Sequence, residues 1–242
     1  MAIEKGSHFS SRYFEEIDDI SEHDNYFTPV LRDVLIQVGA RDMRALDVGC
    51  GTGLFLKPLV DAGCTELYGV DGPHGFTDRA IRRGYREVAV VADLNSSPLP
   101  GTTASFDLVI CKDVFEHLLN PTHALSEIGR VLKKDGFLLL HVPNHFPLIG
   151  RFKFLFTNNI DTFSFFKDES RWTFPHVRFY EHSDSLRVLA EHGFSLVLDL
   201  SYHFQVIPVL SRFRLFPALR RYLVNHFPNQ FAAGFTLLVR KG

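Results

Sequence analysis

A glycine-rich segment, AlaLeuAspValGlyCysGlyThrGly at residues 45–53, has the composition of a nucleotide-binding loop. A short apolar run leads into Gly49, Gly51 and Gly53, and glycines let a backbone turn tightly and approach a ligand closely. A second apolar run ends in Asp71, about twenty residues on, the interval at which a βαβ unit places an acid beside a ribose. We therefore expect residues 45–71 to bind a nucleoside.

The spacing and charge of this loop indicate which nucleotide it binds. A dinucleotide site has the spacing G-x-G-x-x-G and holds a pyrophosphate at a helix N-terminus. Here the spacing is G-x-G-x-G and Asp47 precedes it, so the loop would repel a pyrophosphate and attract a cationic amino group. We expect a ligand with a ribose and a positive charge, which S-adenosylmethionine has, and an NAD-type cofactor is disfavoured.

The elements that must position these residues follow from the hydrophobic pattern. From about Arg44, short apolar runs alternate with helical patterns, as is typical of βα units on a parallel sheet. Asn120 and Pro121 suit the start of one helix, and LysLysAspGly at 133–136 suits its end. We predict strands at 45–48, 66–70, 88–91, 108–111, 136–142, 195–200 and 234–241, and helices at 54–62, 76–83, 121–132 and 183–192. The expected fold is a Rossmann-like, seven-stranded, mostly parallel sheet flanked by helices.

The domain organisation that we expect is a single domain over residues 1–242. It would carry an N-terminal helical cap (1–43), an aromatic insertion after the fifth strand (143–182) and a helical insertion before the last strand (203–230). Many of the 24 phenylalanines lie in the two later insertions. In the first of these, residues 151–157 and 162–166 alternate like edge strands or a lid; core packing and an apolar acceptor pocket are the alternatives.

The composition excludes several classes of protein. The formal net charge is -2 and no long block of like charge occurs, so we expect no nucleic-acid partner. No apolar run has membrane-spanning length and no signal peptide is apparent, which favours a cytoplasmic protein. Membrane-surface contact through the basic-apolar run at 212–221 is less favoured than a solvated helix face. Cys50, Cys64 and Cys111 form no CxxC pair and are expected to be reduced thiols.

Four further motifs follow Asp47, the glycine loop and Asp71 in the chain. They are AlaAspLeu (92–94), PheAspLeuVal (106–109), PheGluHisLeu (115–118) and ArgValLeuLysLysAspGly (130–136). In this order and spacing the set resembles the class I S-adenosylmethionine-dependent methyltransferases over about residues 40–145. Residues 176–194 resemble the closing helix and strand of many small-molecule members of that family.

The resemblance implies that S-adenosylmethionine is the cofactor and S-adenosylhomocysteine the product. Asp47 and the loop Gly49, Cys50, Gly51, Thr52 and Gly53 would hold the methionine moiety. Asp71 would bind the ribose with Gly72 beside it, and Asp93 and Leu94 would bind the adenine; capping of a turn is the alternative role for either acid. Lys112 and Asp113 would lie at the end of the fourth strand, facing the cofactor. GlyProHisGly at 72–75 departs from the family pattern because Gly72 offers no side chain to the adenine, and His74 is the candidate to stack there.

Methyl transfer by direct displacement depends mainly on alignment of the reactants, which can contribute about 7–11 kcal/mol. If a general base is used, His117 and His145 are the candidates, since histidine titrates near neutrality; the alternative is that Glu116 and His117 only shape a loop. Candidate substrate residues are Glu116, Asn144, Phe165, Phe166, His176 and Tyr180. A metal site built from Asp113, Glu116, His117 and His145 is not required by their spacing, and we expect no metal ion.

The predicted function is transfer of a methyl group to an oxygen or nitrogen of a small-molecule acceptor. The alternatives are a non-catalytic S-adenosylmethionine-binding sensor and a partner-binding protein resembling the methionine-biosynthesis methyltransferase-like group. The expected partner is the acceptor alone, with the protein a monomer or homodimer.

Overall fold

The computed structural model describes residues 25–39, 43–72, 77–91, 93–157, 176–206 and 217–242. The chain divides into two compact units. The first unit comprises residues 1–111, 120–137 and 241, and the second comprises residues 112–119, 138–240 and 242. Both units contribute strands to a seven-stranded sheet of order β3-β2-β1-β4-β5-β7-β6.

Four strands of the first unit form parallel pairs. They are β1 (Arg44–Val48), β2 (Glu66–Asp71), β3 (Glu87–Val90) and β4 (Phe106–Lys112, whose last residue belongs to the second unit). β1 pairs with β2 on one side and with β4 on the other, so Asp47 lies opposite Gly69 and Ile110. The strand order therefore reverses between β1 and β4, and ligands of open α/β sheets bind at the carboxyl ends of strands at such a point.

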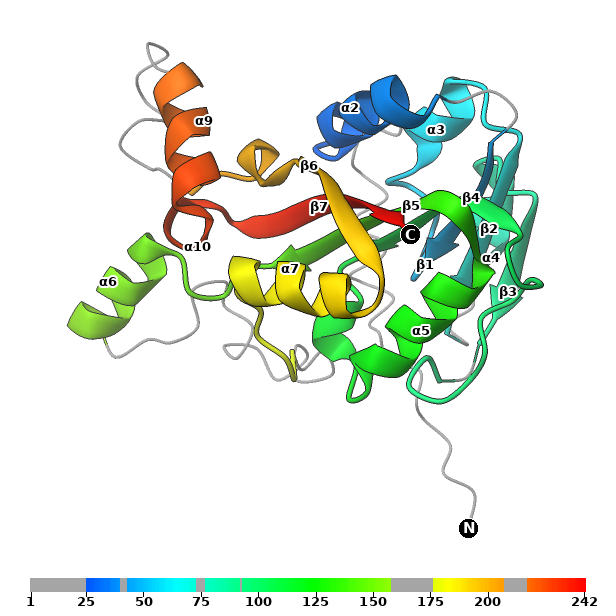
Figure 1. The fold of residues 1–242 in the computed structure, drawn as a ribbon. Coiled ribbons are helices and arrows are strands. Elements are labelled where there is room, and N and C mark those ends of the chain that lie inside the picture. The colour runs from blue at the N-terminus through cyan, green and yellow to red at the C-terminus, as the bar shows by residue number, and fades with distance from the viewer. Residues whose placement is uncertain (1–24, 40–42, 73–76, 92, 158–175, 207–216) are drawn as a thin grey trace. The chain divides into compact units, whose positions relative to one another are not determined.

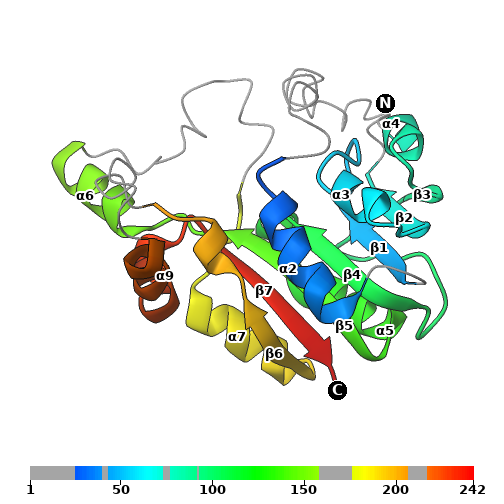
Figure 2. The same ribbon diagram turned by 90° about the horizontal axis from the view of Figure 1, so that it is seen from above.

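The helices of the first unit are α2 (Thr28–Val38), α3 (Lys57–Asp61), α4 (Thr77–Arg82) and α5 (Pro121–Val131). The side chain of Asn120 caps α5 by accepting a hydrogen bond of 3.3 Å from the amide of His123, as predicted. The buried face of α5 carries the apolar residues Ala124, Leu125, Ile128 and Val131. α2 and α5 lie on opposite faces of the strands of this unit (Figures 1 and 2).

The second unit contains the C-terminal half of β5 (Leu132–Pro143) together with β6 (Phe194–Asp199) and β7 (Gly234–Lys241). β7 runs in the opposite direction to β5 (Figures 1 and 2) and buries Phe235, Leu237, Leu238 and Val239. The other described elements of this unit are the short 3-10 helices η1 (Phe115–His117) and η3 (Ser201–His203), α6 (Leu148–Thr157), α7 (His182–Glu191), α9 (Pro217–His226) and α10 (Pro228–Phe231).

Two expectations about local structure are wrong. Residues 133–136 do not end a helix: Leu132, which is fully buried, already has extended backbone angles of φ -70° and ψ 137°, and β5 begins there. Residues 151–157 do not form edge strands but lie in α6, whose N-terminal turn is closed by a hydrogen bond of 3.1 Å from the amide of Arg151 to the carbonyl of Pro147. An alternation of apolar side chains over so few residues does not by itself exclude a helix.

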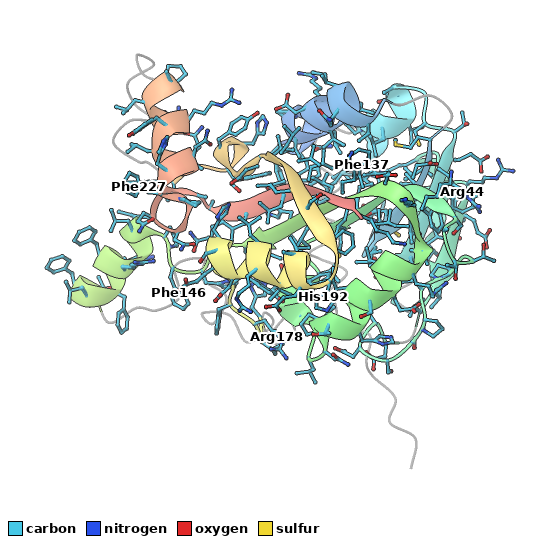
Figure 3. The ribbon with its side chains drawn as sticks, in the orientation of Figure 1. Arg44, Phe137, Phe146, Arg178, His192 and Phe227 are labelled. Atoms are coloured by element: carbon cyan, nitrogen blue, oxygen red, sulfur yellow. The ribbon has the colours of Figure 1, made fainter. Side chains whose placement is uncertain are left out.

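The phenylalanines of α6 are not core residues. Phe152, Phe154 and Phe156 are 50%, 48% and 79% exposed, and Figure 3 shows aromatic side chains projecting from this helix. Residues 162–166, with Phe165 and Phe166, lie outside the described residues. Within the described ranges, the helices are all too short or too polar to cross a lipid bilayer.

Candidate cofactor site and histidine cluster

The loop after β1 turns through three glycines in the left-handed region, with φ of 80° at Gly49, 51° at Gly51 and 79° at Gly53. The amides of Gly49 and Cys50 donate to the carbonyl of Val70, at 2.8 and 3.2 Å, and hold the loop against the end of β2. Side chains with a Cβ rarely adopt these angles, so glycine is required for the turn itself. The loop therefore has the conformation that its sequence predicts.

Asp71 joins the end of β2 to this loop. One carboxylate oxygen accepts a hydrogen bond from the amide of Gly51, and the other accepts one of 2.6 Å from the amide of Gly72. The side chain is half-buried. Asp71, which is predicted to bind the ribose, thus lies against the glycine loop. The amides of Gly51 and Gly72, two predicted cofactor-binding residues, hold its carboxylate.

Asp47 has a partner that the sequence did not indicate. The hydroxyl of Tyr85 donates a hydrogen bond of 2.6 Å to its carboxylate, and both side chains are buried. Burial and then the charge of Asp47 raise the pKa of Tyr85 well above its ordinary value, so the phenol remains a donor. A Cβ on Gly53 would lie 2.8 Å from the Tyr85 ring and from the Cα of Ala80, so close packing also requires glycine there.

Two acids, Asp47 and Asp71, act on the Cys50 thiol of the glycine loop. Burial is the main cause that raises the pKa of the Cys50 thiol, and the negative charges of Asp47 and Asp71 raise it further. The buried thiol therefore stays protonated at neutral pH. The side chain of Thr52 is also buried, and its carbonyl accepts a hydrogen bond of 2.9 Å from Arg83. A site with this charge suits a ligand with a cationic group better than a pyrophosphate, and these residues therefore fit S-adenosylmethionine.

Asp93, the predicted adenine ligand, is exposed and organises a turn. Its carboxylate accepts hydrogen bonds from the amide and side chain of Asn95, at 2.9 and 2.7 Å, and from the hydroxyl of Ser96 at 3.1 Å. The bonds from Asn95 are the main cause that lowers the pKa of Asp93. Leu94 is half-buried in the same turn. Binding of adenine by this pair stays a prediction, and His74 lies outside the described residues.

In the second unit, Asp113 follows β4 with an unusual positive φ of 53°. Its carboxylate forms an ion pair with Lys112 and lies 3.5 Å from Nε2 of His141. Burial opposes its ionisation, but the Lys112 ammonium and His141 hold its pKa below the ordinary value. His141 is buried and its Nδ1 lies 2.7 Å from the Thr236 hydroxyl.

Three predicted histidines meet close to Asp113. The ring of His176 lies edge-on to the rings of His117 and His145, at centroid distances of 4.7 and 4.8 Å. Nε2 of His145 lies 2.5 Å from Nδ1 of His176. Burial lowers the pKa of both His145 and His176 to about 4, so both imidazoles are neutral at physiological pH. Both candidate bases therefore belong to one cluster.

Glu116 lies beside these histidines and is only 1% exposed. Burial, with the negative charge of Asp113 as the next cause, raises its pKa well above the ordinary value. Tyr180 contacts the same region, since its hydroxyl donates a hydrogen bond of 3.0 Å to the carbonyl of Phe115. The second unit thus brings together four of the predicted catalytic or substrate residues: Glu116, His117, His176 and Tyr180.

Asn144 has a different environment. Its amide nitrogen donates to the carbonyls of Ala232 and Asn229, at 2.8 and 3.1 Å, and its oxygen accepts a hydrogen bond from the amide of Phe146. These bonds tie the end of β5 to the segment before β7. The contacts that the structure shows for this buried side chain are structural, and contact with substrate stays a prediction.

Two side-chain partners in these sites, Tyr85 and Thr236, could not be found from motifs. Tyr85 lies 38 residues from Asp47, and Thr236 lies 95 residues from His141. The local sequence pattern around each of them predicts secondary structure but does not indicate a contact with the distant partner. The pairing depends on the sheet order, which brings these distant segments together.

Residues 46–140 match the family model of the methyltransferase domain. A ubiquinone biosynthesis O-methyltransferase of Xanthomonas oryzae is 35% identical over 112 residues, which are 43% of this chain and 44% of that protein. The human methyltransferase-like protein 27 is 34% identical over 95 residues, 39% of this chain and 38% of the relative. The chain thus spans about two fifths of the length of these curated relatives.

Solved structures extend the likeness to the fold of most of the chain. An S-adenosylmethionine-dependent methyltransferase from Mesorhizobium loti aligns with 91% of this chain and 100% of its own, with a TM-score of 0.59 and 18% identity. The magnesium protoporphyrin IX methyltransferase of Synechocystis, solved with S-adenosylhomocysteine bound, aligns over 97% of both chains with a TM-score of 0.58 and 16% identity. Residues 46–140 thus match the methyltransferase-domain model, and the solved structures show that most of the chain has the fold of S-adenosylmethionine-dependent methyltransferases.

Proposed function

We propose that this protein transfers the methyl group of S-adenosylmethionine to an oxygen or nitrogen of a small-molecule acceptor by direct displacement. The observation that carries the proposal is the geometry of Asp71, whose carboxylate is held against the glycine loop by the amides of Gly51 and Gly72. An acid so placed at the end of β2 is positioned for the hydroxyls of a ribose. The likeness to a ubiquinone biosynthesis O-methyltransferase supports an oxygen acceptor.

The residues of the first unit would bind and orient the cofactor. Asp47, fixed by Tyr85, would attract the ammonium group of the methionine moiety. Asp71 would accept hydrogen bonds from the ribose, and the glycine loop would allow the close approach of the ligand. When bound, S-adenosylmethionine supplies a methyl group on a positively charged sulfur. The contribution of the protein is then mainly alignment.

The residues of the second unit would contact the acceptor. His117, half-buried next to His176, would accept the proton that an acceptor hydroxyl or amine loses during methylation. Tyr180 would help to hold the acceptor. A neutral imidazole is the form that can accept a proton, and burial keeps the neighbouring His145 in that form.

Calorimetric titration of the purified chain with S-adenosylmethionine, S-adenosylhomocysteine and NADH tests the cofactor assignment. We expect the first two to bind with one site per chain and NADH to give no saturable heat. Tighter binding of NADH would overturn the proposal. Release of S-adenosylhomocysteine in the presence of phenols or amines would then test transfer, and binding without any turnover across such a panel would support the sensor alternative.

A further inference from the structure

Glu116, His117 and His176 form a cluster of potential metal ligands. Each offers one ligand atom, a carboxylate oxygen or an imidazole nitrogen, and these atoms lie within 4.8 Å of one another. Glu116 is 1% exposed, and its Oε2 has no hydrogen-bond partner among the described residues. Buried polar atoms are almost always paired, and an unpaired buried carboxylate oxygen is particularly unfavourable. The unpaired Oε2 of Glu116 therefore favours binding of a ligand at this position.

The backbone holds the three residues in place. The amides of Val177 and Arg178 both donate to the carbonyl of Glu116, at 2.8 and 3.1 Å. The guanidinium of Arg178, labelled in Figure 3, donates to the carbonyls of Leu118 and Leu119. These bonds connect the segment that follows His176 to the residues directly after η1. His176 is thereby brought beside Glu116 and His117, although 59 positions separate His176 from His117 in the sequence.

A fourth residue orients one of the three. Nε2 of His145 lies 2.5 Å from Nδ1 of His176. A histidine that binds a metal ion through one ring nitrogen commonly has the other held by a neighbouring group, which fixes the tautomer and the ring plane. His145, only 8% exposed, occupies that place for His176.

We propose that Glu116, His117 and His176 bind one divalent transition-metal cation, of the zinc or cobalt(II) class, and that His145 orients His176 for this role. Two imidazole nitrogens and one carboxylate oxygen form a ligand set that such ions prefer, whereas magnesium and calcium prefer oxygen alone. In a tetrahedral site, bonds of about 2.0–2.2 Å place the ligand atoms about 3.3–3.6 Å apart, so ligand atoms that lie 4.8 Å apart would approach each other by about 1.2–1.5 Å when the ion binds.

Three protein ligands leave at least one coordination position for a further donor, as in catalytic rather than structural zinc sites. That an oxygen or nitrogen of the methyl acceptor occupies this position rests on the proposed function. Binding of the ion itself does not, because all the residues involved belong to the second unit and none of them is assigned to the cofactor. In the metal-bound chain His117 would serve as a ligand of the ion and not as the proton acceptor.

Titration of cobalt(II) chloride into the chain, without a histidine tag and after treatment with a chelator, tests the proposal. Calorimetry and visible absorption should show one equivalent bound with nitrogen and oxygen ligands. Glu116→Gln and His176→Ala should each weaken binding by about a hundredfold or more, since each removes a ligand. His145→Phe should weaken it by about tenfold to a hundredfold, as loss of an outer partner does.

The matched control is His226→Ala, which removes an exposed histidine of α9 and should leave cobalt binding unchanged. Absence of saturable binding, or binding that survives both Glu116→Gln and His176→Ala, would overturn the proposal. His176 is half-buried on an irregular segment, so its alanine variant keeps the test decisive if the glutamine variant fails to fold. The titration uses neither cofactor nor acceptor. A chain that binds cobalt but not S-adenosylmethionine would therefore contradict the proposed function and not this inference.

Discussion

The hydroxyl of Tyr85 donates a hydrogen bond of 2.6 Å to the carboxylate of Asp47, across 38 positions of the sequence. Tyr85 lies between α4 and β3, whereas Asp47 lies in β1 just before the glycine loop. Asp47 is only 6% exposed, and a carboxylate removed from water needs hydrogen-bond donors within the protein. The orientation of the acid that we assign to the ammonium group of the cofactor is therefore set by a residue that follows α4.

Tyr85→Phe should lower the free energy of unfolding by about 1.5–3 kcal/mol, the range for hydrogen bonds to charged groups. The change removes one oxygen and leaves the ring packed against Gly53. It should also weaken binding of S-adenosylmethionine, because Asp47 loses the contact that orients it. Urea unfolding and calorimetric titration measure the two effects.

Tyr68→Phe is the matched control, since the hydroxyl of Tyr68 donates a hydrogen bond of 2.8 Å to Glu66 in a less buried setting. Loss of that bond should cost less than about 1 kcal/mol, because solvent replaces it. It should not change cofactor affinity. Equal effects of the two variants on stability and binding would show that burial of the Asp47 pair has no special importance.

Gly53→Ala should destabilise the fold more than Gly63→Ala. Both glycines have positive φ, 79° and 97°, so both alanines bring backbone strain. A Cβ on Gly63 meets nothing within 4 Å, whereas one on Gly53 would lie 2.8 Å from Ala80 and Tyr85. The excess loss should be about 1–3 kcal/mol, as for other overpacked sites. Similar midpoints in thermal or urea unfolding would contradict the assigned packing.

Asp71→Asn should weaken binding of S-adenosylmethionine by more than about 1 kcal/mol, since it replaces charge-assisted bonds to the ribose by neutral ones. The structure adds a second cause, because the amides of Gly51 and Gly72 also lose a charged acceptor and the loop becomes less well fixed. Asp78→Asn, at an exposed acid in the first turn of α4, is the control. Unchanged affinity in Asp71→Asn, measured by calorimetry, would remove this acid from the ribose site.

The sequence predicted the seven strands, the glycine loop and the place of Asp71 because each depends on local pattern. Apolar runs followed by Gly49 or by Asp71 have few other interpretations in an α/β protein. The pattern failed where two structures suit the same residues. LysLysAspGly at 133–136 resembles the end of a helix, but burial of Leu132 draws the chain into β5.

Contacts between segments that are distant in the chain could not be predicted from the sequence. Nothing near His176 or His117 indicates that the two rings meet, because the contact depends on backbone bonds from Val177 and Arg178 to Glu116. The expectation that no metal ion binds considered Asp113, Glu116, His117 and His145 and did not include His176. The structure instead pairs Asp113 with Lys112 and His141.

The stability of the protein should depend on pH through His141. Burial, partly offset by the charge of Asp113, lowers the pKa of this histidine from 6.5 to about 4, with Lys112 adding to the decrease. Folded chains therefore bind a proton at His141 less readily than unfolded chains. The contribution of His141 to the free energy of unfolding is complete above pH 6.5. It falls as the pH decreases toward 4, because protonation of the histidine then favours the unfolded state.

Between pH 7 and pH 5 this one residue should reduce the free energy of unfolding by about 2 kcal/mol. His141→Asn keeps a polar group near the Thr236 hydroxyl but does not titrate, so the variant should be less stable at pH 7 and should lose about 2 kcal/mol less than the parent chain on going to pH 5. Urea unfolding at the two pH values measures both losses. Since the other histidines titrate in both proteins, the difference between the losses isolates His141, and equal losses would show that its imidazole is not held neutral by burial.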